Sequence, residues 1–229
     1  MKVTTPRMGL CYLGYRRFLE GFGHEVFIPP PPTKHTLSLG TKYSPEFVCF
    51  PFKIITGQYL QVLERHPEIE AIFTSGGRGP CRAGLYGVLH RQILAERGRH
   101  LELYLLEPPV LANIKRMSPG MTWWRRIRNT LYAWRLLLAV EEVERLSHFY
   151  RPREAVPGAT DRAMARALAH VEKIPAIRSL RRLTKSLARH FARSVPVKEG
   201  FEPLRVGIVG EIFVVLDDFA NCDIERTLG

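Results

Sequence analysis

Short apolar runs alternate with amphipathic stretches along the first 112 residues, and Gly or Pro marks most of the junctions. The apolar runs predict strands at residues 2–5, 24–28, 69–75 and 101–106. The amphipathic stretches predict helices at residues 12–22, 33–39, about 51–65 and 83–97, with Thr33 as a helix cap. Strands that alternate with helices predict a Rossmann-like α/β domain over residues 1–112, with a parallel sheet and helices on its faces.

Residues 113–200 have a different pattern. Apolar side chains such as Ile127, Leu131, Trp134 and Leu138 recur at helical spacing. A Pro- and Gly-containing stretch at 151–158 breaks this first helix, and further helices are expected at 161–171, with Thr160 as cap, and at 176–192. The pattern predicts a helical insert or cap whose tryptophans face the core and whose arginines face water.

The last segment, residues 201–229, returns to a strand-like pattern. Residues 206–216 are predicted to form a strand, residues 217–222 a loop at its end, and Ile224 to begin a helix. We expect this segment to be the first strand and loop of a second, truncated α/β lobe.

The net charge of +12 is unevenly distributed. Residues 113–193 contain 18 Lys+Arg and 6 Asp+Glu, a balance of +12, whereas the rest of the chain contains 16 of each. The basic character therefore belongs to the helical block, which indicates a segment with its own surface and its own partner.

Apolar residues make up 45% of the chain, enough for a sizeable core, but no run is long and apolar enough to cross a bilayer. The N-terminus carries no apolar signal segment, so the expected location is the cytoplasm and no membrane contact is expected. Four cysteines in such a protein indicate metal-binding, catalytic or buried thiols rather than a disulfide framework.

Two of these cysteines follow predicted strands, where parallel sheets bind their ligands. Cys49 lies within residues 47–53, and Cys81 lies within the glycine-rich loop at 76–82. Thiolates are the usual ligands of iron–sulfur clusters. The position of Cys81 before a predicted helix, beside Arg78 and Arg82, favours its thiolate. The spacing is not a compact CxxC pair, so two buried, inert thiols are the alternative that composition favours.

Three segments, 33–40, KYSPEFVCFPFK (42–53) and GGRGPCRAGLY (76–86), resemble the acyl-CoA dehydratase activase-related family, which comprises relatives of the 2-hydroxyacyl-CoA dehydratase iron–sulfur components. GEIFV (210–214) and FAN (219–221) are similar to a later motif of that family. The resemblance covers about residues 1–112 and 204–229. Because relatives continue beyond the position of Gly229, it implies a fragment, a shortened member or one part of a split protein.

The resemblance implies Rossmann-like lobes with a [4Fe-4S] or related cluster between them, and low-potential electron transfer to a CoA-thioester or a similar acceptor. Cys49 and Cys81 match the family's cysteines and are the expected metal ligands; Cys222 and Cys11 are candidates for the remaining positions. The implied partners are an ATP-dependent activator or another electron-donor protein, and a second subunit in a homo- or heterodimer. A lyase or reductase component is thus one possible enzyme class, but no GxxxxGK[ST] motif supports an ATPase.

Other residues have alternative interpretations. Gly76, Gly77, Arg78 and Gly79 form either a phosphate-binding cradle for coenzyme A or only a tight turn. Lys53 and Arg78 either neutralise a cluster or phosphate, or face solvent. The alternative function is a cluster-free binding or scaffold protein of the same fold, whose basic helices bind nucleic acid or an acidic partner. Nucleic acid is less expected, because the basic residues surround the helices instead of forming one stripe.

Overall fold

The computed structural model describes residues 1–76, 81–106, 110–176 and 178–229. The chain forms two compact units, residues 1–130 and 131–229, and each is described by itself. The division falls within one long helix, α6 (Trp123–Tyr150). The expected domain boundaries after residues 112 and 200 stay predictions.

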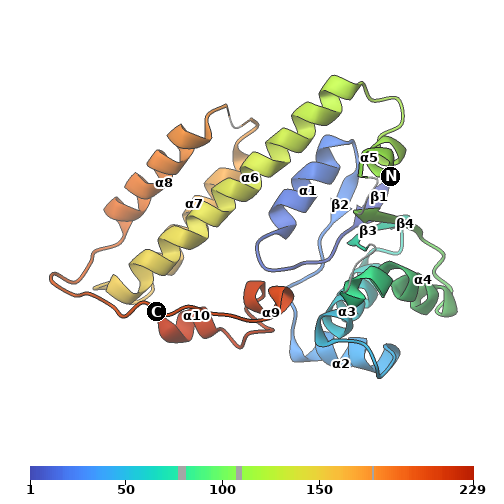
Figure 1. The fold of residues 1–229 in the computed structure, drawn as a ribbon, viewed down its shortest axis with the longest axis horizontal. Coiled ribbons are helices and arrows are strands. Elements are labelled where there is room, and N and C mark those ends of the chain that lie inside the picture. The colour runs from blue at the N-terminus through green and yellow to red at the C-terminus, as the bar shows by residue number, and fades with distance from the viewer. Residues whose placement is uncertain (77–80, 107–109, 177) are drawn as a thin grey trace. The chain divides into compact units, whose positions relative to one another are not determined.

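Unit 1 contains a four-stranded, all-parallel sheet, which confirms the predicted α/β class (Figure 1). Its strands lie in the order β2 (Glu25–Phe27), β1 (Lys2–Thr4), β3 (Ala71–Ser75) and β4 (Glu102–Leu106). Residues 71–74 of the central strand β3 are all buried, as expected for a strand that is covered on both faces.

Helices cover both faces of this sheet. Phe73 on β3 contacts Tyr15 and Phe18 of α1 (Tyr12–Gly21), with ring centroids 6.4 and 6.1 Å apart. The opposite face is covered by α4 (Tyr86–Glu96), where a Cβ on Gly87 would lie 2.5 Å from the Leu105 side chain. A short 3₁₀ helix, η1 (Arg82–Leu85), precedes α4, and α5 (Val110–Met117) follows β4.

Helices α2 (Lys34–Tyr43) and α3 (Phe50–Arg65) approach each other with their backbones almost in contact. A Cβ placed on Gly40 would lie 1.7 Å from the carbonyl oxygen of Lys53, and one placed on Gly57 would lie 1.9 Å from that of Thr36. Only glycine fits at these two positions. Thr33 caps α2 as predicted, because its hydroxyl accepts a hydrogen bond from the Thr36 amide over 3.3 Å.

Unit 2 contains the C-terminal part of α6, the 3₁₀ helix η2 (Arg151–Arg153), and helices α7 (Ala159–Lys173) and α8 (Leu180–Ser194). Two short helices, α9 (Ile212–Leu216) and α10 (Ile224–Leu228), follow. The predicted cap Thr160 is wrong. It lies in the first turn of α7, where the Glu154 carboxylate accepts hydrogen bonds from the amides of Gly158 and Thr160 over 2.6 and 2.8 Å.

The predicted strand at 206–216 is also wrong. Residues 201–209 have no regular secondary structure and residues 212–216 form α9, which begins where Glu211 accepts a hydrogen bond from the Val214 amide over 3.0 Å. A strand needs a neighbouring strand to pair its backbone groups, and within the described residues none pairs with this segment. Leu204 and Val209 are therefore left 93% and 97% exposed.

The expectation that the tryptophans face the core is wrong as well, because Trp123, Trp124 and Trp134 are 46%, 79% and 60% exposed. The buried stripe of α6 consists instead of smaller aliphatic residues such as Leu136, Val140 and Val143. None of the helices in the described part of the chain is long and apolar enough to span a bilayer.

Candidate functional site

The carboxyl ends of β1 and β3 form the topological switch point of the sheet. From β1 the chain moves outward to β2 on one side, whereas β3 and β4 extend on the other side. Loops that leave such a point diverge, and the crevice between them is where parallel α/β sheets bind ligands. Cys11 lies in the loop after β1, and Cys81 follows the loop after β3.

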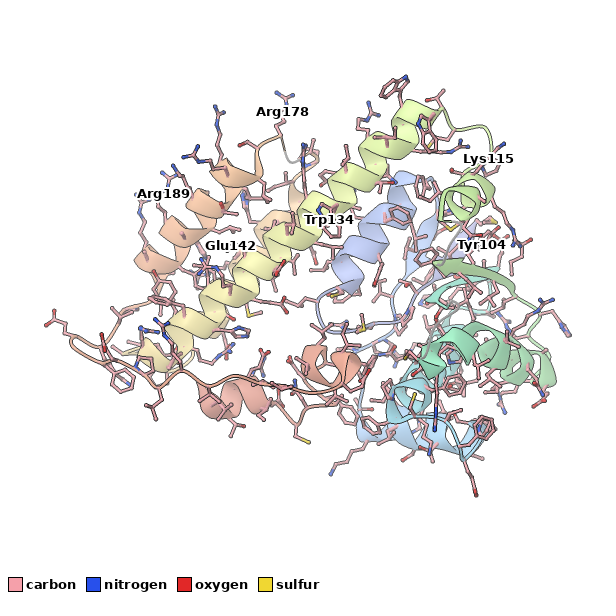
Figure 2. All side chains as sticks on the ribbon, viewed as in Figure 1. Tyr104, Lys115, Trp134, Glu142, Arg178 and Arg189 are labelled. Atoms are coloured by element: carbon pink, nitrogen blue, oxygen red, sulfur yellow. The ribbon has the colours of Figure 1, made fainter. Side chains whose placement is uncertain are left out.

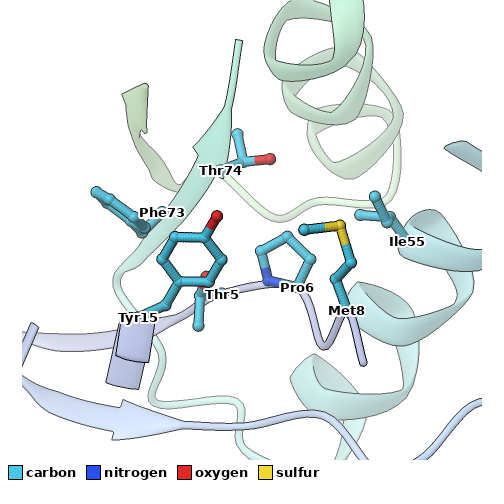
Figure 3. A pocket seen from close by; sticks show the side chains of 7 residues that line it. All are labelled: Thr5, Pro6, Met8, Tyr15, Ile55, Phe73 and Thr74. Atoms are coloured by element: carbon cyan, nitrogen blue, oxygen red, sulfur yellow. The ribbon is translucent and has the colours of Figure 1, made fainter. Parts of the chain in front are cut away.

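A small pocket lies at this switch point (Figure 3). Its volume is about 40 Å³, and it is lined by side chains from the β1 loop, α1, α3 and β3: Thr5, Pro6, Met8, Tyr15, Ile55, Phe73 and Thr74. That volume accommodates a few water molecules or one small group of a larger ligand, but not a whole drug-sized molecule. Sequence reasoning missed the pocket; the Thr5-Pro6 pair directly after a strand was the available signal.

Cys11 is half-buried at the start of α1, close to this pocket. Burial raises the pKa of Tyr15, and the nearby Cys11 thiol raises that pKa further. Cys11 is thus associated electrostatically with a pocket-lining side chain.

Cys49 is half-buried in the loop between α2 and α3, directly before α3, so the expectation that it follows a strand is wrong. Its Sγ atom lies 2.7 Å from the Tyr86 hydroxyl oxygen, within hydrogen-bonding distance. The Tyr86 ring is fixed in turn by an edge-on contact with Phe52, at a centroid distance of 5.1 Å and an interplanar angle of 73°. The Cys49 thiol therefore has a partner whose position is set by the core.

Beneath this contact lies His90, which stacks on Phe52 with ring centroids 4.2 Å apart and planes 1° apart. Burial lowers the pKa of His90 to about 3, so its imidazole is neutral at physiological pH. His90 is therefore a core aromatic residue that supports the Cys49 loop and carries no charge.

Cys81 is exposed and occupies the position directly before η1, where its Sγ accepts a hydrogen bond from the Ala83 amide over 3.4 Å. The α-helix itself begins only at Tyr86, so the expectation that an α-helix starts directly after Cys81 is wrong. The next residue, Arg82, donates a hydrogen bond from Nη1 to the carbonyl oxygen of Phe47 over 2.9 Å. Phe47 belongs to the loop that carries Cys49.

Two interactions thus join the two cysteine loops. Arg82, next to Cys81, binds the backbone of the Cys49 loop, and Tyr86, at the start of α4, contacts the Cys49 thiol. The structure brings together segments that lie more than thirty residues apart in the sequence.

The predicted cradle is described only in part. Gly77, Arg78 and Gly79 lie outside the described residues. Gly76 directly follows β3, and a Cβ there would make a tight contact of 3.0 Å with the Leu105 side chain. Lys53 is half-exposed in the first turn of α3, and its backbone oxygen faces Gly40.

Cys222 lies in unit 2, exposed, in the turn before α10. Its backbone is left-handed, with φ of 60°, and Asp223 after it has φ of 54°. None of the four cysteines forms a disulfide bond. Across the described part of the chain, no group of three or more His, Cys, Asp or Glu side chains could hold a metal ion.

Unit 2 has a second cluster of ionisable groups that sequence reasoning missed. His148 Nε2 on α6 lies 2.6 Å from Glu225 Oε2 on α10. One helical turn earlier, burial together with the nearby Glu225 charge raises the pKa of Glu144 to about 7. The i,i+4 spacing of Glu144 and His148 was the available signal.

The chain matches no protein-family model, no curated protein and no solved structure.

Proposed function

We propose that the two joined cysteine loops of unit 1 form one half of an iron–sulfur site. Cys49 and Cys81 would each supply a thiolate ligand. The observation that carries the proposal is the hydrogen bond from Arg82 to the Phe47 carbonyl, because it fixes one cysteine loop against the other. The Cys81 loop follows β3, at the end of the sheet where parallel sheets bind ligands, and Arg82 attaches the Cys49 loop to it.

The donor set fits half of a cubane cluster. A [4Fe-4S] cluster usually takes four thiolates, whereas this edge offers two matched cysteines and no third metal-binding side chain grouped with them among the described residues. The remaining ligands would come from Cys11, from water or from a second subunit. A dimer that shares one cluster satisfies this requirement most simply.

The bound cluster would supply one-electron transfer at low potential, for which a CoA-thioester or a similar acceptor is the proposed substrate class. The residues of this chain would hold and tune it. Tyr86 is positioned to hydrogen-bond the Cys49 sulfur, and such bonds to ligand sulfurs shift reduction potentials. Arg82 adds a positive charge beside Cys81. An electron-donor protein, such as an ATP-dependent activator, is the partner that this function requires.

Anaerobic purification of the full chain with iron and sulfide analysis tests this proposal. We expect iron and sulfide in the wild type and loss of both in Cys49→Ala and in Cys81→Ala. Tyr86→Phe keeps both thiols, so it should retain the iron but change the midpoint potential. Iron-free wild-type protein, or unchanged iron in both cysteine variants, would contradict the proposal.

The second candidate is a cluster-free binding protein of the same fold. It is favoured by the pocket at the switch point, whose lining contains no cysteine. Light scattering of the same anaerobic preparations separates the two. A shared cluster predicts a dimer that dissociates when either Cys49 or Cys81 is replaced, whereas a cluster-free protein keeps its oligomeric state in both variants.

A further inference from the structure

Helix α8 carries a strongly basic surface that the proposed iron–sulfur function does not use. Residues 173–198 contain eight Lys+Arg and no Asp or Glu. Six of these residues, all exposed, lie on α8 or just before it, and we call them the α8 basic face: Arg178, Arg181, Arg182, Lys185, Arg189 and Arg193. In Figure 2, the labelled side chains of Arg178 and Arg189 project outward from this part of the chain.

The five helical members lie on one side of α8. At about 100° per residue they fall within an arc of about 120°, centred opposite Leu187. The opposite side carries Leu183, Leu187 and Phe191, which are buried. The expectation that basic residues surround the helices is therefore wrong for α8, where they form one continuous stripe.

The stripe is presented by a well-anchored helix. The Phe191 ring stacks on Tyr150 with centroids 5.7 Å apart, and His190 Nε2 lies 3.0 Å from the carbonyl oxygen of Ala163 on α7. Just after α8, the Ala155 amide donates to the carbonyl oxygen of Pro196 over 2.8 Å. The positive charges are thus held in fixed register along the helix.

These charges are not neutralised within the described part of the chain, where no carboxylate forms a salt bridge with any member of the α8 basic face. Arg181, Lys185, Arg189 and Arg193 repeat every four residues, a spacing at which like charges repel. Arg181 and Arg182 also lie in the first turn, where the helix dipole disfavours cations. Both effects destabilise the helix, and binding of an anion would relieve the repulsion between these cations.

We infer that the α8 basic face binds the phosphate backbone of nucleic acid. Five of its six residues are arginines, whose guanidinium forks match phosphate geometry. Four-residue spacing places the charges about 6 Å apart along the helix, so six cations extend over about 20 Å. A linear polyanion offers phosphates in such a row.

The composition of the surface favours nucleic acid over an acidic protein. Protein interfaces have an apolar or aromatic centre, whereas the exposed side of α8 offers only Ala192 and Ser186 besides its basic residues. Protein–nucleic acid interfaces are polar and strongly positive, as this one is. Because no aromatic side chain lies on this side of α8 to stack on bases, binding should be insensitive to base sequence.

Fluorescence anisotropy with a labelled duplex of about 20 base pairs tests the inference on the full-length chain in a salt series. We expect the logarithm of the binding constant to fall with the logarithm of salt with a slope of about −5, since each phosphate contact contributes about −0.9. A duplex of scrambled sequence should bind equally well. Absence of duplex binding at about 50 mM salt overturns the inference.

Two triple variants with the same net charge separate the α8 basic face from total charge. Arg182→Gln, Lys185→Gln and Arg189→Gln should weaken binding at least about tenfold and make the slope less negative by about 2.7. The control combines Lys34→Gln, Arg65→Gln and Arg91→Gln, three exposed residues of unit 1, and should bind within about threefold of the wild type. Equal losses in the two triples would show that only net charge matters.

Circular dichroism establishes that both triples fold. If the α8 triple does not fold, the single variants Lys185→Gln and Arg189→Gln apply the same test, each expected to reduce the slope by about 0.9. Competition with polyglutamate identifies the class of partner. The duplex should compete better at equal charge concentration, and stronger competition by polyglutamate would assign the surface to an acidic protein instead.

Discussion

The guanidinium of Arg82 donates a hydrogen bond to the backbone carbonyl of Phe47, 35 positions earlier in the chain. This contact joins the loop of Cys81 to the loop of Cys49 without involving either thiol. Replacing Arg82 therefore tests the placement of the two loops without changing the thiols, because both cysteines remain.

Replacing Arg82 with alanine should loosen the Cys49 loop. We expect the free energy of unfolding to fall by about 0.5–1.5 kcal/mol, since one hydrogen bond is lost at an exposed position. The half-buried Cys49 thiol should then react severalfold faster with a thiol reagent, as measured by mass spectrometry of the labelled peptide. Arg91→Ala, at an exposed position on α4, is the control and should leave the Cys49 rate unchanged. An unaltered rate in Arg82→Ala would show that the contact does not hold the loop.

Gly40→Ala and Gly57→Ala should each destabilise unit 1 by about 3 kcal/mol or more, because the new methyl group meets a backbone carbonyl that cannot move aside independently. Chemical denaturation measures this loss. The matched control is Gly207→Ala, since a Cβ there meets nothing within 4 Å. Similar stabilities for all three variants would mean that α2 and α3 do not approach as closely as the structure shows.

Unit 2 should lose stability as the pH rises from about 4.5 through neutrality. The pKa of Glu144 in the folded protein is about 7, above its ordinary value of 4.5, and contact with Glu225 raises the pKa of His148. A raised folded pKa contributes stability that is complete below the ordinary value and is lost as the pH passes the folded value. Glu144 therefore predicts a decline of the thermal midpoint from about pH 4.5 to about pH 7, and His148 continues the decline above its ordinary pKa of 6.5.

Glu144→Gln should reduce this decline, because glutamine remains neutral throughout the range. Glu142→Gln is the control: Glu142 pairs with Arg145 rather than with His148, so its replacement should leave the slope with pH intact. Identical pH profiles for wild type and Glu144→Gln would contradict the prediction. At lower pH the opposite limit applies, since His148 lowers the pKa of Glu225 and that contribution is lost as the carboxylate becomes protonated.

Leu204→Ser and Val209→Ser should be nearly neutral for stability, within about 0.5 kcal/mol, because these side chains are 93% and 97% exposed. They should also make the protein more soluble by removing exposed apolar surface. Val171→Ser is the matched control, since Val171 is completely buried in α7 and its replacement should cost more than 1 kcal/mol, on the order of the loss for other buried truncations. Substantial destabilisation by Val209→Ser would indicate that the residue is buried in solution.

The strands and helices of unit 1 could be predicted because local signals agree with the tertiary fold. Alternating apolar runs identified all four strands, and Thr33 identified the start of α2. The position of Cys49 directly before an α-helix followed from the same signals, whereas Cys81 precedes the short 3₁₀ helix η1 instead. What the sequence could not predict was the pairing between loops, since the contacts made by Arg82 and Tyr86 depend on how α3 and α4 pack.

The errors were concentrated where tertiary context overrides a local pattern. Residues 206–209 have the composition of a strand but lack a neighbouring strand within the described residues, so they do not form one. The tryptophans of α6 occupy helical positions that suggested a core, yet smaller aliphatic residues fill it. The α8 basic face was overlooked because charge was considered over the whole helical block instead of one helix at a time.

The pairing of β1 with both β2 and β3 has a consequence for how the protein is made. Val3 pairs with Val26, but its other neighbour, Ala71, is synthesised 68 residues after it. Strand β1 must therefore wait until β3 has been synthesised before its second edge is covered. Such long-range contacts slow folding, so this protein should fold more slowly than helical proteins of the same size. Its nascent chains should keep an open sheet edge during that time.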